Sequence, residues 1–207
     1  MHGAIREYRL RPGTAEETIG KISEQFIPMI ANVPGLRAYT LTVVGGSKIV
    51  TTSVFEDQAG AQESVRRAAD WVKATLAASV VAPPRVTIGE LPVRSVIGNA
   101  KAGYGVMRRF ACTTANGVLI AERVREGLLP MLRATPGFAS FGLLLADGED
   151  RGGASLSAFA DRATADVANE RALLWVKENV GALLTKPPEV LVGKIRLRYS
   201  RSTVRTG

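Results

Sequence analysis

Two arginines and two tryptophans stand at corresponding places in the two halves of this chain. Arg6 and Arg108 are 102 residues apart, and Trp71 and Trp175 are 104 residues apart. An arginine that faces a cavity favours an anionic or phenolate ligand, and a tryptophan can stack on a planar molecule. These four residues are therefore candidate ligand-binding residues. The alternative is structural: arginines that pair with carboxylates at a rim, and tryptophans that anchor a helix to a sheet.

Two further candidates differ between the halves. Tyr8 corresponds to Phe110, so an acid-base role for that hydroxyl would exist only in the first half. Asn169 corresponds to Val65, and because asparagine is a poor helix-interior residue, it could serve to orient a ligand. Core packing of Tyr8 and solvent exposure of Asn169 are the alternatives. The candidate ligand-binding set is Arg6, Tyr8, Trp71, Arg108, Asn169 and Trp175, and no catalytic residue is assigned.

The composition excludes several chemistries. The chain of 207 residues holds one cysteine, Cys112, and one histidine, His2 at its start. A nucleophilic cysteine needs an activating group, and most metal sites use histidine and cysteine ligands. We therefore expect no metal and no cofactor. The opening residues carry no apolar segment after a basic start, which predicts a cytoplasmic protein.

The net charge of +8 admits anionic partners, but much of the excess lies near the C-terminus. Basic residues there are Lys194, Arg196, Arg198, Arg201 and Arg205. This pattern is typical of a solvated basic tail, with a binding element as the alternative.

The chain contains an internal duplication. A shift of 102 residues aligns Pro34-Gly35 with Pro136-Gly137, and a shift of 104 aligns Trp71-Val72-Lys73 with Trp175-Val176-Lys177. The two-residue insertion falls in a turn, where insertions are tolerated. The predicted organisation is a first repeat at 1–92, a linker at 93–102, a second repeat at 103–195 and a basic C-terminal tail at 196–207. The tail is expected to be dispensable for folding.

Each repeat reads as an α+β unit. Its predicted elements are a strand at 3–10, a helix opened by a Thr14/Glu17 capping box and kinked or ended by Pro28, a hairpin of 36–44 and 48–55, a helix at 59–78 and a strand at 85–91. This is the ferredoxin-like order β-α-β-β-α-β. Helices on one sheet face leave the other in need of a partner. The predicted fold is therefore two tandem ferredoxin-like repeats that form an intramolecular pseudo-dimeric α+β barrel.

The motifs of each repeat resemble a known family. Tyr8-Arg9-Leu10-Arg11-Pro12-Gly13, the Pro34-Gly35 turn after Pro28, and Phe55-Glu56-Asp57 ahead of Ala69-Asp70-Trp71-Val72 resemble the antibiotic-biosynthesis-monooxygenase-like family of dimeric α+β barrels. The resemblance covers essentially each whole repeat. It implies a small ligand in the barrel cavity near an asparagine and a helix tryptophan, which makes Trp71 and Trp175 candidates for that role.

Family members include cofactor-independent quinone-forming monooxygenases, haem-degrading monooxygenases and proteins without known activity. The haem-degrading members ligate iron through a histidine soon after the helix tryptophan. Neither Val72–Val81 nor Val176–Thr185 contains a histidine. Haem degradation is therefore not expected here.

Two functions fit these observations. One is a cofactor-independent monooxygenase that acts on a small aromatic or polyketide-like molecule, and the other is a non-catalytic small-ligand-binding or stress-associated barrel protein. The expected partner is a small aromatic or anionic ligand in the barrel cavity, closer to one repeat, with homo-oligomers left open. A membrane is not an expected partner. Nucleic acid is not expected either, because an RNA recognition motif needs stacking aromatic residues on its third strand, and the corresponding strand here, 48–55, has only Phe55.

We expect purified protein to bind neither haem nor a catalytic metal, because the usual ligands are missing. Titration with haem, followed by absorption, should give no stoichiometric band in a His2→Ala variant. A stoichiometric band in that variant would contradict the expectation.

Overall fold

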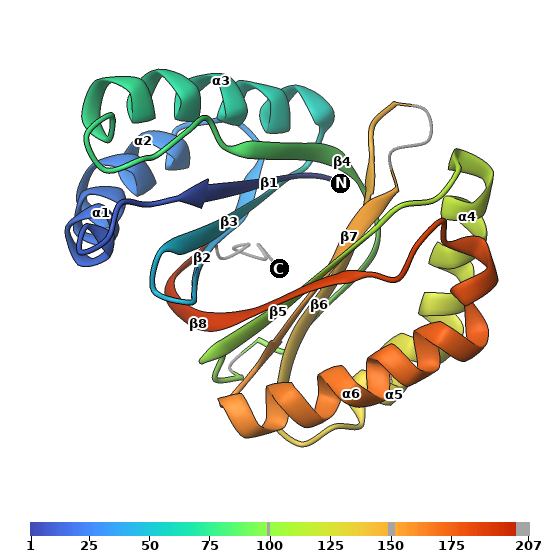
Figure 1. The fold of residues 1–207 in the computed structure, drawn as a ribbon. Coiled ribbons are helices and arrows are strands. Elements are labelled where there is room, and N and C mark those ends of the chain that lie inside the picture. The colour runs from blue at the N-terminus through green and yellow to red at the C-terminus, as the bar shows by residue number, and fades with distance from the viewer. Residues whose placement is uncertain (99, 149–151, 202–207) are drawn as a thin grey trace, which may run out of the picture. The chain divides into compact units, whose positions relative to one another are not determined.

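The computed structural model describes residues 1–98, 100–148 and 152–201. Contacts between its elements divide the chain into two compact units (Figure 1). Unit 1 consists of Met1–Ile88 and Arg196–Gly207, and unit 2 consists of Gly89–Ile195. Within the described residues, no helix is both long and apolar enough to cross a membrane.

Unit 1 follows the predicted order of elements. They are β1 (His2–Arg9), α1 (Ala15–Lys21), the π-helical turn η1 (Ile22–Phe26), α2 (Ile27–Ala31), β2 (Leu36–Val44), β3 (Lys48–Phe55), α3 (Gln58–Thr75) and the first part of β4 (Arg85–Val96). Strand β3 pairs antiparallel with both β1 and β2, and its register with β1 runs from His2 opposite Phe55 to Arg9 opposite Lys48.

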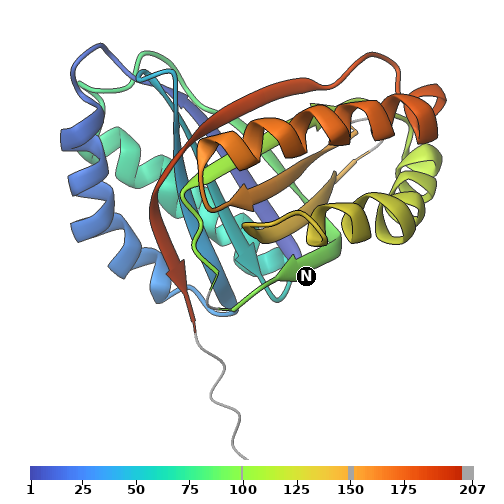
Figure 2. The ribbon, with the colours of Figure 1, turned by 90° about the horizontal axis from the view of Figure 1, so that it is seen from below.

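Unit 2 repeats this order. Its elements are β5 (Tyr104–Phe110), α4 (Thr114–Arg123), η2 (Val124–Leu128), α5 (Leu129–Arg133), β6 (Phe138–Ala146), β7 (Gly153–Phe159), α6 (Arg162–Asn179), the short 3₁₀ turn η3 (Gly181–Leu183) and most of β8 (Glu189–Ser200). Strand β7 lies between β5 and β6, and β5 also pairs with β8. In this unit α6 lies beside the α4–α5 segment (Figure 2).

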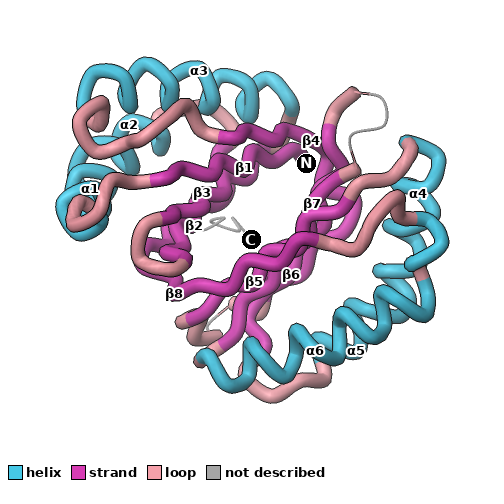
Figure 3. The backbone as a smooth tube through the Cα atoms, in the orientation of Figure 1, coloured by secondary structure: helices cyan, strands magenta, loops and turns pink. Residues whose placement is uncertain are grey.

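The strands of the described chain are hydrogen-bonded in the closed order β1-β3-β2-β8-β5-β7-β6-β4. Strands and helices are separated by colour in Figure 3. The predicted fold class is confirmed: an α+β barrel built from two β-α-β-β-α-β units.

Strands β4 and β8 each run through both units. Strand β4 passes from unit 1 to unit 2 after Ile88, and β8 passes from unit 2 to unit 1 after Ile195. The strands therefore continue to Val96 and Ser200, into the segments predicted as linker and tail. The repeat boundaries themselves stay a prediction.

The C-terminal part of β8 is an integral strand of unit 1. Exposed Arg196 and Arg198 alternate with half-buried Leu197 and Tyr199, which pack against the apolar core of that unit. Arg196 also forms a bidentate ion pair with Glu16 on α1, at 2.6 and 2.8 Å. The run of cations concealed a period-two strand pattern, and for residues 196–200 the expectation of a dispensable tail is therefore corrected.

The first helix of each unit continues past its proline. Pro28 and Pro130 each follow a π-helical turn, η1 and η2. Proline donates no hydrogen bond, and its ring clashes with the carbonyl four residues earlier. The longer hydrogen-bond spacing of a π turn relieves that conflict. Each helix therefore has a π turn before its proline, in place of the expected kink or end.

The helix starts differ from the expected capping. Thr14 precedes α1, but its hydroxyl donates to the carbonyl of Arg11 at 2.9 Å and does not cap the helix, so the predicted capping-box bond is wrong. Aspartates cap the longer helices: Asp57 accepts from the amide of Gly60 at 2.8 Å, and Asp161 accepts from Thr164 at 2.9 Å. These caps fix where α3 and α6 begin.

We expect the double substitution Leu197→Ala/Tyr199→Ala to lower the free energy of unfolding by about 2–4 kcal/mol, because two partly buried side chains leave an apolar core. Chemical denaturation should measure the loss. Lys194→Ala/Ser200→Ala, at exposed positions of the same strand, is the matched control. Equal stability of the two double variants would restore the idea of a dispensable tail.

Candidate functional site

Arg6 is a buried cation between the sheet and the long helix of unit 1. Its side chain is 1% exposed. Nη1 donates to Ser53 Oγ on β3 at 3.1 Å, and Nη2 donates to Ser64 Oγ on α3 at 2.6 Å. The residue thus joins β1, β3 and α3, on the face of the strands that the helix covers.

The charge of Arg6 has no acidic counterpart. Among the described residues no carboxylate pairs with it, and its Nε, although buried, has no hydrogen-bond acceptor. Burial lowers the pKa of the Arg6 guanidinium, while the neighbouring Tyr8 and Tyr39 raise it. A buried charge is costly unless it is paired, so an acceptor at the Nε–H would lower the cost of burying Arg6.

A pocket of about 360 Å³ within unit 1 reaches Arg6. That volume lies in the range of small-ligand sites. Its walls come from β1, α3 and the segment that precedes β4, and Lys73 is exposed where it lines the pocket. Apart from Arg6, Tyr8 and Lys73 the lining is apolar: Val65, Ala69, Val72, Ala77, Val80, Val81, Ala82, Pro83, Pro84 and Val86.

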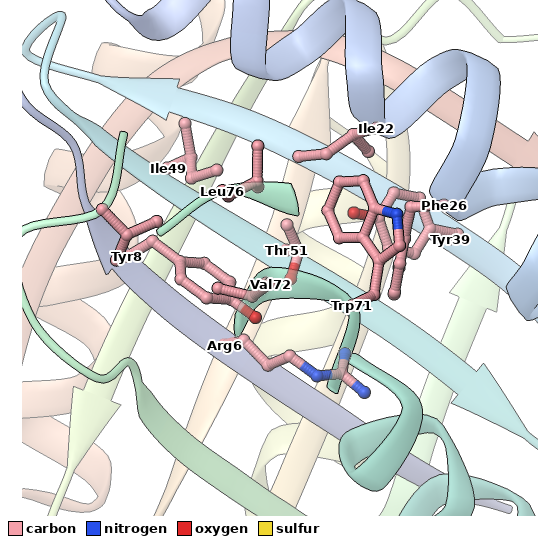
Figure 4. Close-up of a pocket in the computed structure, with 11 residues that line it drawn as sticks. Arg6, Tyr8, Ile22, Phe26, Tyr39, Ile49, Thr51, Trp71, Val72 and Leu76 are labelled. Carbon is pink, nitrogen blue, oxygen red and sulfur yellow. The ribbon is translucent and has the colours of Figure 1, made fainter. Parts of the chain in front are cut away.

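A small inner recess of about 10 Å³, with room for roughly one water molecule, also touches Arg6 and Tyr8. Figure 4 shows the Tyr8 hydroxyl turned toward the Arg6 side chain. In that view Trp71 and Tyr39 lie on the opposite side from Tyr8. Burial raises the pKa of both tyrosines. Their phenols are therefore neutral hydrogen-bond donors at neutral pH, not bases.

The position of Trp71 is compatible with packing between helix and sheet and with contact to a ligand. Its ring packs against Phe26 at a centroid distance of 5.2 Å, and Phe26 packs against Tyr39 at 5.7 Å. This aromatic row anchors α3 to η1 and to the sheet. The same ring lines the recess, so the structural interpretation of Trp71 is supported and contact with a ligand stays a prediction.

Unit 2 carries the corresponding arginine in a different setting. Arg108 is 2% exposed. Its Nη1 donates to Ser157 Oγ at 3.1 Å, and its Nε donates to Asn169 Oδ1 on α6 at 2.9 Å. Burial lowers the pKa of Arg108 to about 10, so it stays charged at neutral pH, and Nη2 has no acceptor.

Asn169 therefore provides Arg108 with an acceptor for Nε, which Arg6 lacks. Its equivalent in unit 1 is Val65, which lines the pocket beside the unpaired Nε of Arg6. The amide oxygen of Asn169 thus bonds the same nitrogen, Nε, that has no acceptor in Arg6. Asn169 is thus half-buried and bonded to Arg108, which replaces the alternative of solvent exposure.

Two aromatic rings of unit 2 pack against glycines. Phe110 replaces Tyr8, and Gly153 replaces Ile49. A Cβ at Gly153 would lie 2.9 Å from the tip of the Phe110 ring, so that ring takes the room of the missing side chain. Trp175 packs against Gly127, where a Cβ would come within 2.7 Å of the indole ring. Trp175 is therefore a packing residue in this structure.

The predicted site residues thus fall into two groups. The structure brings Arg6, Tyr8 and Trp71 together in unit 1, and it joins Arg108 to Asn169 in unit 2. Arg6 lies on the face of β1 that α3 covers, because it bonds Ser64 of that helix, and not on the face toward the cavity that the strands enclose. Period-two alternation shows which side chains share a face but not which face the helices cover.

Sequence reasoning missed several residues of the site. Ser53 and Ser157 hold the two arginines and are themselves related by the shift of 104, a signal that the repeat could have provided. Ser64 and Tyr39 come close to Arg6 only through the fold. No cluster of three or more possible metal ligands occurs among the described residues.

No protein-family model matches this sequence, and no curated protein matches it. Solved structures share its fold over nearly the whole chain. A proposed monooxygenase of Fusobacterium nucleatum has a TM-score of 0.77 at 6% identity and covers 97% of this chain and 94% of its own. A proposed monooxygenase of Lactobacillus acidophilus has a TM-score of 0.74 at 11% identity, with 96% and 95% covered.

An anthrone oxidase-like protein has a TM-score of 0.68 at 14% identity and covers 96% of this chain and 92% of its own. At such identities the likeness shows the fold alone, that of the dimeric α+β barrels. Because each match spans nearly all of both chains, the duplicated arrangement is shared.

We expect Arg108→Met/Asn169→Val to raise the free energy of unfolding by about 1–4 kcal/mol, because apolar groups of similar size replace a buried charge and its amide partner. Thermal and chemical denaturation should measure the gain. The single variant Asn169→Val should instead lose stability, since it leaves Arg108 less well bonded. A double variant less stable than Asn169→Val would contradict the view that the buried charge of Arg108 lowers the stability of the fold.

Proposed function

We propose that unit 1 binds a small acidic aromatic molecule in the Arg6 pocket and acts on it as a cofactor-independent monooxygenase. One observation carries the proposal: a fully buried arginine, without a carboxylate partner among the described residues, lines an apolar pocket and has no acceptor for its Nε–H. An anionic ligand oxygen would complete the hydrogen bonding of Arg6 and neutralise its charge.

The pocket walls favour a flat, largely apolar molecule. Valines, alanines and prolines supply most of the lining, which suits an aromatic body. Tyr8 offers a second hydrogen-bond donor near the guanidinium. Together these groups favour a phenol, an enol or an aromatic acid whose oxygen lies at Arg6.

The ligand has to contribute its own acidity. The described lining contains no carboxylate and no imidazole, and Lys73 is exposed. A positive charge in a dry site lowers the pKa of a bound acid, so Arg6 would favour the ionised form. A molecule with a weakly acidic CH₂ or phenol fits this requirement, whereas a neutral hydrocarbon does not.

Such a substrate can react with dioxygen unaided. Its anion donates electrons to O₂, a carbon–oxygen bond forms, and the resulting hydroperoxide loses water. The balance for an activated CH₂ group is R₂CH₂ + O₂ → R₂C=O + H₂O, in which carbon is oxidised by four electrons and O₂ is reduced. The protein's part is to stabilise the anion and to exclude water. The names of the structures that share the fold, two proposed monooxygenases and an anthrone oxidase-like protein, support this reaction class.

The second candidate is a non-catalytic ligand-binding or stress-associated barrel protein that uses the same pocket. The lack of a general base among the described lining residues favours it. Oxygen uptake separates the two, because a binding protein shifts the ligand's spectrum or pKa without consuming O₂.

Two further expectations remain part of the proposal. RNA recognition is disfavoured because Phe55, the one aromatic residue of β3, is fully buried and offers no surface for base stacking. A cytoplasmic location stays a prediction from the sequence.

We expect Arg6→Met to weaken the binding of an acidic hydroxyanthrone by about 1.5–3 kcal/mol, the range for a charge-assisted hydrogen bond. Stability should change little, because Ser64 keeps its own hydrogen bond to the carbonyl of Ala61. Fluorescence titration gives the affinity, and an oxygen electrode gives the rate of O₂ uptake above the uncatalysed rate. Arg108→Met is the control and should leave both unchanged.

A sharper variant is Val65→Asn, which places in unit 1 the residue that bonds Arg108 in unit 2. The new amide should accept from Nε of Arg6 and compete with the ligand, so affinity falls while the arginine stays in place. Unchanged affinity in both Arg6→Met and Val65→Asn would reject the pocket as the ligand site. Weaker binding in both variants, with no O₂ uptake by the wild type, would instead favour the binding protein.

A further inference from the structure

Helix α6 of unit 2 exposes two large apolar residues on one side. Val167 is 55% exposed and Leu174 is 57% exposed. They are seven residues apart, so they lie on the same side of the helix, two turns from each other. Glu170 and Arg171 lie between them, and neither has an ion-pair partner among the described residues.

The equivalent helix of unit 1 carries charges at the same positions. Glu63 stands for Val167, and Asp70 stands for Leu174. On α3, Arg66 pairs with Glu63 at 2.8 Å and with Asp70 at 3.1 Å, and Arg67 pairs with Glu63 at 2.7 Å. The arginine hydrogen bonds lower the pKa of Glu63 to about 2. The exposed face of α3 thus carries ion pairs within the helix. The same face of α6 carries exposed apolar residues instead.

We infer that α6 is a contact surface for a second copy of this chain, in which two α6 helices pair antiparallel about a two-fold axis. An axis between Glu170 and Arg171 places Val167 opposite Leu174 of the second copy. The same axis places Glu170 opposite Arg171 of the second copy. Apolar and charged pairs therefore match in one register, and two-fold symmetry makes each pair twice.

An antiparallel pair of α3 helices about the same kind of two-fold axis would be repulsive. It would place Glu63 opposite Asp70 and Arg66 opposite Arg67 of a second copy, so every pair brings like charges together. Opposed like charges disfavour an association. The duplication thus provides an internal comparison: helices of the same length and position, of which α6 alone is self-complementary.

Self-complementarity identifies the partner as another copy. A different protein would need apolar groups and charges that match α6, but nothing in that case requires α6 to match itself in the reverse direction. A single helix pair is smaller than the roughly 1,200–2,000 Å² of a standard stable interface. The dimer should therefore be weak and dependent on concentration.

The test is sedimentation equilibrium of the full chain between about 1 and 500 µM. We expect the wild type to approach twice the chain's mass at the upper end. Val167→Glu/Leu174→Asp, which installs the residues of unit 1, should remain monomeric throughout. Glu63→Gln/Asp70→Asn on α3 is the matched control and should dimerise as the wild type does. Circular dichroism confirms that each variant is folded.

A charge exchange tests the register. Glu170→Arg alone places arginine opposite arginine and should raise the dissociation constant at least tenfold. The double variant Glu170→Arg/Arg171→Glu restores opposite charges and should recover most of the affinity. A monomeric wild type at 500 µM, or a dimer that survives Val167→Glu/Leu174→Asp, overturns the inference. Failure of the double exchange to recover affinity overturns the proposed register.

Discussion

The buried guanidinium is the constraint on which each unit depends. A cation inside an apolar core needs acceptors in fixed places, and Arg6 finds them on β3 and α3. Helix α3 has to approach the strands closely for Ser64 to reach Nη2 at 2.6 Å. Its buried side allows this, since it consists of small residues: Gly60, Ala61, Ser64 and Ala68. Unit 2 repeats the pattern with Ala165, Ala168 and Ala172 on α6. The small residues and the arginine therefore require one another.

The two copies have diverged on opposite sides of their long helices. On the inner side, unit 1 has a pocket that Arg6 lines, whereas in unit 2 the Phe110 ring lies over Gly153, in the place of the Ile49 side chain. On the outer side, unit 1 keeps a network of ion pairs, whereas unit 2 exposes Val167 and Leu174. The proposals for ligand binding and for self-association thus assign one task to each unit.

The fold was predictable because its signals are local or periodic. Matching tryptophans revealed the repeat, and alternating and helical patterns gave the order of strands and helices in each copy. Three features were not accessible in this way. The strand ending at Ser200 was obscured by the charges that alternate with Leu197 and Tyr199. The orientation of Arg6 depends on which face α3 covers, and both Ile5 and Arg6 are buried. The contacts with Ser64 and Tyr39 join distant segments that no short pattern relates.

One exchange in the third turn of each long helix decides what its arginine can do. Asn169 accepts from Nε of Arg108, while Val65 leaves Nε of Arg6 without an acceptor. Each guanidinium thus has two side-chain acceptors, and one nitrogen has none: Nε in Arg6 and Nη2 in Arg108. A ligand that bonded Nε in unit 2 would have to displace an amide that is held in place on a helix. In unit 1 the valine adds apolar surface to the pocket that Arg6 also lines, and it offers no acceptor. A neutral ligand would leave the charge of Arg6 uncompensated, so the same substitution that opens the site also selects an anion. Under the proposed function, ligand choice would therefore depend on a side chain that carries no charge of its own.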